Sequence, residues 1–205
     1  VQKYFKDTYG RETVFIPNGV NRPVVREADI IKQKFGLEKD DYILFLGRLV
    51  PEKGIQYLIE AFKQVETDKK LVIAGGASDT DAFATELKEM AKEDDRILFT
   101  GFVQGKELDE LYSNAYVYCL PSDLEGMPLS LLEAMSYGNC CLVSDIEECT
   151  SVVGNKALVF KKSDISDLKE KLQYACDDED TVRKIKAEAA GYICKRYNWD
   201  NVTDC

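Results

Sequence analysis

Residues 122–138 read S-D-L-E-G-M-P-L-S-L-L-E-A-M-S-Y-G, and the rest of the chain is best understood outward from this stretch. It follows an apolar run that Pro121 closes, and it continues into a segment with helical periodicity. Pro128 suits the first helical position, where a missing N–H costs nothing, and Gly138 suits the position just past the end. The stretch therefore predicts a strand, a turn and a helix over about 128–137.

A helix that begins just after a strand presents unpaired backbone N–H groups and the positive end of its dipole, a combination that binds phosphate. Met127, Leu129 and Ser130 would supply these amides. Glu125 lies in the turn and Glu133 about one turn into the helix, from where its side chain tips back toward the N-terminus. Carboxylates would repel a bare phosphate, so the pattern favours a ligand that also offers hydroxyls, such as a nucleotide-sugar.

At these residues the sequence resembles a known family. Glu125 and Glu133, with seven residues between them in E-G-M-P-L-S-L-L-E-A-M, look like the E-x7-E motif of glycosyltransferase family 4, a retaining family with the two-domain GT-B fold. The alternative is an ordinary amphipathic helix with two solvated glutamates, because Leu129, Leu132 and Met135 would make an adequate core stripe.

The composition bounds the class of partner. A chain of 205 residues, 45% of them hydrophobic, is long enough for about one domain with a proper core. Lys and Arg total 27 against 37 Asp and Glu, a net charge of −10, which disfavours broad attraction to nucleic acid or anionic lipid. An anionic ligand would have to be held by local cations.

The cysteines indicate a reducing compartment. There are seven, an odd number, with no C-x-x-C pair, and Cys119, Cys140 and Cys141 lie inside apolar runs, as small core residues do. The absence of histidine excludes a His zinc site or His general base from this chain. No secretory signal opens the sequence, and no apolar run is long enough for a membrane span.

Short apolar runs alternate with amphipathic segments along most of the chain. Such alternation predicts a doubly wound, Rossmann-like α/β domain with a parallel sheet, whose ligands bind at the carboxyl ends of the strands. The residues to inspect therefore follow Leu46, Ala74, Thr100 and Leu120. The expected strands are 42–46, 71–74, 97–100, 117–120, 140–143 and 157–160, and the expected helices are 28–35, 55–65, 83–91, 108–111, 128–137, 165–176 and 181–196.

The loop after the first strand carries two cations. It reads G-R-L-V-P-E-K-G from Gly47, and Arg48 and Lys53 suggest a diphosphate site because a guanidinium grips phosphate with a planar fork. The run resembles the family's G-R-L-x-x-x-K-G element, whose Arg and Lys hold the donor diphosphate. The alternative is a surface loop with stray charges.

The loops after the next two strands also resemble the family. Gly75 and Gly76 match a glycine pair that leaves room near the ligand, although they could equally form a helix-entry turn. Phe102 and Val103, in F-T-G-F-V, match the segment whose backbone contacts the nucleotide base, although they are equally compatible with core residues at a strand end.

The resemblance also divides the chain. Residues 13–16 are expected to form a short strand, and I-P-N-G-V at 16–20 resembles the stretch that ends the family's N-terminal domain. Residues 1–27 would then be a linker and a remnant of a domain absent from this chain, or alternatively an added edge strand. Residues 28–205 would be the nucleotide-sugar-binding C-terminal domain, and N-W-D at 198–200 resembles the family's closing F-S-W-E.

The tripeptide Asp79-Thr80-Asp81 has the D-x-D form that binds a divalent metal in a different glycosyltransferase fold. It is interpreted here as a helix-entry cap, because the GT-B family does not rely on this motif. No metal and no cofactor are expected.

The resemblance implies roles for individual residues. Arg48 and Lys53 would neutralise the diphosphate and Glu125 would contact the donor sugar, so these three are the predicted catalytic residues, while Glu133 would accept hydrogen bonds from the ribose. The acceptor, still unknown, would bind mainly to the absent N-terminal domain, so that this chain alone would bind nucleotide without transferring sugar. The expected location is the cytoplasm, with membrane contact at the inner face made only through that domain. The remaining predicted donor-binding residues are Gly47, Gly75, Phe102, Val103, Gly126, Met127, Pro128 and Leu129.

Two other functions are compatible with the fold class. One is a non-catalytic α/β module that binds a nucleotide or a partner protein. Such a module would have no reason to keep Arg48, Lys53, Glu125 and Glu133 at the mouth of one sheet. The other is a GT-B-fold sugar-nucleotide epimerase, which relies on additional acid and base groups.

Overall fold

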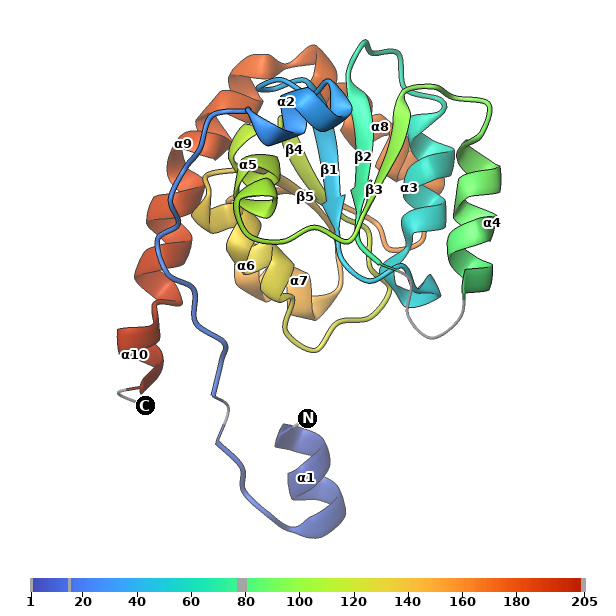
Figure 1. The fold of residues 1–205 in the computed structure, drawn as a ribbon. Coiled ribbons are helices and arrows are strands. Elements are labelled where there is room, and N and C mark those ends of the chain that lie inside the picture. The colour runs from blue at the N-terminus through green and yellow to red at the C-terminus, as the bar shows by residue number, and fades with distance from the viewer. Residues whose placement is uncertain (1, 15, 77–80, 204–205) are drawn as a thin grey trace.

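A parallel sheet forms the centre of the fold (Figure 1). The structure is a computed structural model that describes residues 2–14, 16–76 and 81–203. Within these residues six strands pair in the order β3-β2-β1-β4-β5-β6. They are β1 (Tyr42–Leu46), β2 (Lys70–Ala74), β3 (Ile97–Gly101), β4 (Val117–Leu120), β5 (Cys140–Ser144) and β6 (Leu158–Phe160).

The central strands are continuous apolar runs because both faces of the sheet are covered. Every residue of β4 is buried, and β1 and β2 are buried except at one end. β1 pairs in parallel with β2 from Tyr42 opposite Lys70 to Leu46 opposite Ala74, and on its other side it pairs with β4. The strand order therefore reverses between β1 and β4, and in doubly wound sheets the crevice at this reversal binds ligands.

Helices cover both faces of the sheet (Figure 1). On one face α3 packs against α4 and α8, and on the other α6 packs against α9, with α5 beside α6. The helices are α1 (Gln2–Tyr9), α2 (Ile30–Phe35), α3 (Ile55–Phe62), α4 (Asp81–Ala91), α5 (Lys106–Asn114), α6 (Leu129–Ser136), α7 (Glu147–Val153), α8 (Ile165–Asp177), α9 (Glu179–Arg196) and α10 (Trp199–Thr203), with a 3-10 turn η1 (Pro51–Lys53).

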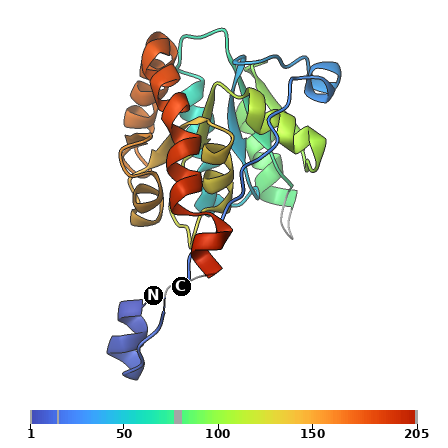
Figure 2. The same ribbon diagram turned by 90° about the vertical axis from the view of Figure 1, so that its left-hand side faces the viewer.

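The N-terminal segment lies apart from the sheet. Helix α1 buries none of its residues and projects away from the rest of the chain in both views (Figures 1 and 2). The predicted strand at 13–16 is wrong, since residues 13, 14 and 16 adopt no strand. Val14 and Ile16 are 79% and 68% exposed, because no sheet edge lies within reach to pair with them. The alternative of an added edge strand is wrong for the same reason.

The linker that follows is held against the main body at two places. The Val20 amide donates to the Tyr197 carbonyl at 2.6 Å, and a Cβ on Gly19 would lie 2.5 Å from the ring of Trp199 in α10. Further on, the Arg26 amide donates to Ser113 Oγ of α5 at 3.0 Å. Residues 19–26 therefore run over the face that α5, α6 and α9 cover.

The doubly wound fold predicted from the sequence is confirmed, with differences at element ends. The helix predicted at 128–137 is α6, preceded by Pro128, and Gly138 ends it with a φ of 83°. Helix α5 extends from Lys106 to Asn114, beyond both ends of the predicted 108–111, and α7, η1 and α10 were not predicted.

Most of the described cysteines are buried, as their positions in apolar runs predicted. The six cysteines within the described residues are free thiols, and five of them are buried. Burial raises the pKa of the Cys140 and Cys149 thiols to about 12, so both stay protonated and unreactive near neutral pH. Among the described helices, none is long and apolar enough to cross a membrane.

Candidate functional site

Two loops meet outside the carboxyl ends of β1 and β4, where the strand order reverses. One is 47–54 and the other is 121–128. They approach so closely at Gly54 that an added Cβ would lie 2.0 Å from the Pro121 carbonyl oxygen, and Gly54 also has a φ of 68°. The Asp123 amide donates to the Glu52 carbonyl at 2.8 Å. The loops thus form one continuous wall of the crevice.

Lys53 and Glu125 face each other across this junction. Lys53 Nζ lies 2.6 Å from Glu125 Oε1, and the two side chains are only 16% and 7% exposed. A carboxylate and an ammonium that are both largely removed from water attract more strongly than a surface pair. The structure therefore brings together two of the predicted catalytic residues, which lie 72 positions apart in the sequence.

A cavity of about 170 Å³ opens at the ends of β1, β2 and β3, and the loop that carries Lys53 contributes Gly47 and Arg48 to its lining. Gly75 can line it because the backbones approach closely: a Cβ there would lie 1.8 Å from the Gly47 carbonyl oxygen, and its φ is 152°. Arg48 is exposed at this cavity and Phe102 is 74% exposed. Five predicted site residues line this one cavity, namely Gly47, Arg48, Gly75, Phe102 and Val103, together with Leu46, Ala74 and Gly76.

Glu133 lies in a different cavity and contacts none of the predicted catalytic side chains. It lines a space of about 470 Å³ between the linker, α5, α6 and α10, together with Leu129. Tyr112 Oη donates to Glu133 Oε2 at 3.0 Å. The residue has an exposed side, but the protein around its carboxyl group raises its pKa above the ordinary value, and the hydrogen bond from Tyr112 opposes that rise.

The remaining predicted residues surround the start of α6. The Leu131 and Leu132 amides both donate to the Pro128 carbonyl, so the amides of Leu129 and Ser130 precede the first helical bond. Gly126 and Met127 line a third cavity of about 370 Å³ beside α7. The Asn18 amide of the linker lies 2.9 Å from the Met127 sulfur.

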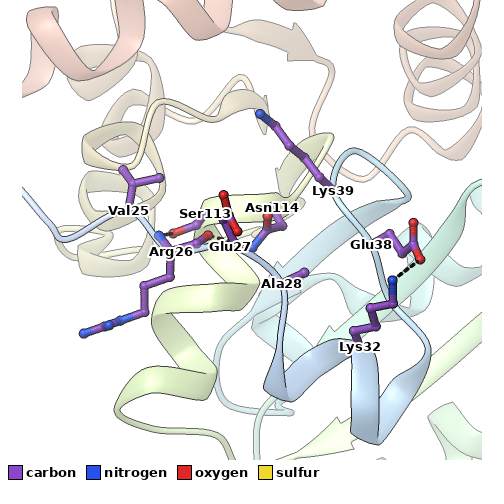
Figure 3. A pocket seen from close by; sticks show the side chains of 9 residues that line it. All are labelled: Val25, Arg26, Glu27, Ala28, Lys32, Glu38, Lys39, Ser113 and Asn114. Atoms are coloured by element: carbon purple, nitrogen blue, oxygen red, sulfur yellow. Dashed lines mark hydrogen bonds and ion pairs between the residues drawn. The ribbon is translucent and has the colours of Figure 1, made fainter.

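A further cavity of about 590 Å³ lies at the other end of the sheet (Figure 3). It is lined by the end of the linker and by residues that directly precede β1 and β4. Lys32 pairs with Glu38 there at 2.8 Å, and the Asn114 side chain donates to the Arg26 carbonyl. Arg26 pairs with Asp109 outside the cavity, and none of the site residues predicted from the sequence lines it, so it is not the candidate site.

The D-x-D tripeptide falls mostly outside the described residues. Asp79 and Thr80 are not described, and the structure shows only that the backbone of Asp81 begins α4. Within residues 2–14, 16–76 and 81–203, no three His, Cys, Asp or Glu side chains gather where a metal ion could be held.

Sequence reasoning missed several hydroxyl groups at the site. Ser122 Oγ donates to Glu125 Oε1 at 2.7 Å, and Ser144 Oγ donates to the Ser122 carbonyl at 2.6 Å. Tyr112, which holds Glu133, lies in a helix predicted too short to include it. The only signal for Ser122 was its position directly after a strand and proline, which many turn residues share.

The sheet order and the loops at its reversal define a Rossmann-like α/β domain. This chain belongs to the glycosyl transferases group 1 family, whose family model matches residues 27–202. It is 28% identical over 177 residues to O-antigen chain mannosyltransferase B of Escherichia coli, an alignment covering 84% of this chain and 46% of that protein. The chain therefore spans about half the length of this curated relative.

Two crystal structures illustrate the similarity of fold. The C-terminal domain of a glycosyl transferase group 1 family protein (LpcC) from Francisella tularensis has a TM-score of 0.75 and 23% identity, covering 88% of this chain and 100% of that one. Anabaena Alr3699/HepE in complex with UDP and glucose has a TM-score of 0.78 and 18% identity, covering 85% and 49%. These similarities confirm the predicted fold as one half of the GT-B architecture.

Proposed function

We propose that this chain is the donor-binding domain of a retaining glycosyltransferase and that it binds a nucleotide-diphosphate sugar at the reversal between β1 and β4. The observation that carries the proposal is the meeting of the two loops there, with Lys53 and Glu125 in contact and Arg48 on the adjoining cavity. HepE, which has the same fold, is seen with UDP and glucose, and the E. coli relative is a mannosyltransferase.

The diphosphate would lie between the two basic side chains and the start of α6. In an acidic protein, Arg48 and Lys53 supply the local positive charge, and the amides of Leu129 and Ser130 point from the positive end of the helix. Charge develops on the diphosphate as the glycosidic bond breaks, so fixed cations there would stabilise the transition state. We propose that these cations replace a metal ion and that no cofactor takes part.

The nucleoside would extend from the diphosphate toward the cavity lined by Gly47, Gly75 and Phe102, which can take a flat base. Glu133 would accept hydrogen bonds from the ribose hydroxyls. Its present partner, Tyr112, occupies Oε2, which leaves the other carboxylate oxygen available.

Transfer itself requires an acceptor. In the proposed reaction the acceptor oxygen forms its bond to the sugar on the face that the diphosphate leaves, the bond to the diphosphate breaks, and a phosphate oxygen takes the acceptor proton. Because this chain spans about half of its relative, we propose that a further domain binds the acceptor and makes any membrane contact from the cytoplasm. A non-catalytic binding module is not favoured, since the relatives are glycosyltransferases.

The test is a binding panel of UDP-, GDP- and ADP-sugars against this chain, read by ligand-observed NMR and calorimetry. Removing a charged partner costs about 1.5–3 kcal/mol, so Lys53→Ala should weaken the best ligand about 10- to 100-fold. Arg48→Ala, an exposed position that will not unfold the protein, should also weaken it. Lys63→Ala is the matched control, because this exposed lysine follows the far end of α3 and carries the same charge.

Two results would contradict the proposal. If binding survives both Arg48→Ala and Lys53→Ala while each variant keeps the melting temperature of the control, the donor site lies elsewhere. Addition of a chelator should leave the affinity unchanged; a loss of affinity that Mg²⁺ restores would contradict the metal-independent part of the proposal.

A further inference from the structure

Within the part of the chain that the structure describes, one oxygen of the Glu125 carboxylate receives two hydrogen bonds and the other receives none. Lys53 Nζ and Ser122 Oγ both lie on Oε1, at 2.6 and 2.7 Å. Among the described residues no donor lies on Oε2. This atom still reaches solvent, because the one buried side-chain N or O atom without a partner in the same residues is Gln56 Oε1. The carboxylate is therefore anchored at one oxygen and presents the other.

Ser122 is itself held in a fixed position. It is completely buried, and its carbonyl accepts a hydrogen bond from the hydroxyl of Ser144, which is also completely buried at the end of β5. Ser144 thus holds the backbone of Ser122, and the buried Ser122 hydroxyl has few other rotamers open to it, because rotation away from Glu125 would lose its hydrogen bond in a low dielectric. The anchor for Glu125 thus extends into the sheet.

The residue after Ser122 fixes the same loop from the other side. Asp123 accepts hydrogen bonds from Tyr57 Oη of α3 at 3.0 Å and from Ser163 Oγ at 2.6 Å. Its amide donates to the Glu52 carbonyl. The turn between β4 and Glu125 is therefore bonded to three separate parts of the chain. These bonds restrict the movement of the Glu125 backbone and so of its carboxylate.

We propose that Ser122 is a positioning residue: together with Lys53 it holds Glu125 Oε1, so that Oε2 is aimed to accept a hydrogen bond from a hydroxyl of the donor sugar. This role rests on the proposed function, since it requires a nucleotide-sugar in the crevice. It adds a requirement on the substrate class, namely a sugar with a free hydroxyl facing Glu125. A positioned acceptor binds better than a mobile one because no rotamer freedom is lost on binding.

The experiment separates the sugar from the nucleotide. The affinities of UDP-glucose against UDP, and of GDP-mannose against GDP, are measured by calorimetry for this chain, and the pair with the tighter sugar nucleotide is used thereafter. Ser122→Ala should weaken the sugar nucleotide about 3- to 10-fold, the value of one hydrogen bond, while the affinity for the nucleotide alone stays within twofold. Ser122→Cys, which replaces the hydroxyl with a somewhat larger thiol that is a weak donor, should change the same ratio in the same direction.

Two controls test whether Ser122 affects the affinity through Glu125. In a double-mutant cycle, Ser122→Ala should cause no further loss in a Glu125→Gln background. Ser113→Ala removes a comparable hydroxyl at the other end of the sheet, where Ser113 bonds the Arg26 amide, and it should leave both affinities unchanged. Thermal unfolding of all variants shows which of them are folded.

The outcomes differ in what they overturn. If Ser122→Ala and Ser122→Cys weaken nucleotide and sugar nucleotide equally, or if the losses of Ser122→Ala and Glu125→Gln add, Ser122 has no positioning role and the donor site stands. If unmodified protein binds none of the four ligands and none of the ADP-sugars of the panel, the proposed function fails and this role fails with it.

Discussion

At the scale of single residues, the proposed role of Glu133 predicts that nucleotide affinity depends on pH. The protein around its carboxyl group raises its pKa above 4.5, so part of the population is protonated at mildly acidic pH. A protonated carboxyl is a poorer acceptor for ribose hydroxyls. We therefore expect nucleotide affinity to fall as the pH is lowered through this raised pKa. The ratio of wild-type to Glu133→Gln affinity, measured for UDP or GDP between pH 4.5 and 8, isolates this step from the titration of the phosphate. A ratio that does not change with pH would contradict the assignment.

Tyr112 should influence the pH at which the nucleotide affinity changes. Its hydrogen bond favours the ionised form of Glu133, so Tyr112→Phe should move the step to higher pH. Tyr137→Phe is the matched control, because the Tyr137 hydroxyl bonds Asp109 instead.

The raised pKa of Glu133 also has a consequence for folding. Between the ordinary and the raised pKa, the native state binds more protons than the unfolded chain. The contribution of Glu133 to stability is therefore lost as the pH rises through that window.

The charged residues of the site could be chosen from the sequence, but their contacts could not. A motif with an expected chemistry singled out Lys53, Glu125 and Glu133. It gave no indication that the first two pair with each other while Glu133 lies in a separate cavity with Tyr112. Those contacts depend on which strands are neighbours. The role of Ser122 was hidden because a serine after a strand is ordinary in any turn.

At the scale of elements, the glycine that joins η1 to α3 should be indispensable. Gly54→Ala places a Cβ 2.0 Å from the Pro121 carbonyl oxygen in a left-handed conformation. The backbone strain alone costs about 1–3 kcal/mol, and the clash adds to it. We expect a clear drop in the free energy of unfolding, measured by urea denaturation.

Gly191→Ala is the control for this substitution, with the opposite sign. Gly191 lies inside α9, and a Cβ there meets nothing within 4 Å. Replacing a helical glycine with alanine should stabilise the protein by up to about 1 kcal/mol. Equal effects at the two positions would mean that the two loops do not meet as described.

Strands were predicted more accurately than short helices, for a physical reason. A strand buried on both faces is a continuous apolar run, and the predicted 117–120 coincides with β4. Helix α7 has only two turns, too few for its buried residues Cys149, Val152 and Val153 to stand out as a periodic stripe. At 13–16 the opposite error occurred, because a short run of β-branched and aromatic residues, T-V-F-I, looks like a strand even where there is no neighbour to pair with.

At the scale of the whole molecule, the strand order decides which loops are neighbours, and no local sequence pattern contains that information. The alternation of strands and helices predicted a doubly wound sheet. It did not indicate that β1 and β4 would be neighbours, and their adjacency is what brings residues near 50 and near 125 to one crevice. Long-range order of this kind depends on the packing of all the helices together.

This organisation leads to a prediction about activity. The chain spans about half the length of its E. coli relative, and the described residues include the proposed donor crevice at one edge of the sheet. We expect the 205-residue chain to bind sugar nucleotide but to transfer no sugar to added acceptors, as measured with a radiolabelled donor. Measurable transfer that Lys53→Ala abolishes would show that no further domain is needed.

The contacts of Gly19 and Val20 with Trp199 and Tyr197 join the two terminal segments of the fold side by side, next to the loop that carries Met127. A force applied to residues before Gly19 would therefore act on both segments and not on the linker alone. Movement of the residues before Gly19 would also reach the Met127 loop, because the Asn18 amide lies 2.9 Å from the Met127 sulfur, and would therefore change the shape of the proposed donor site.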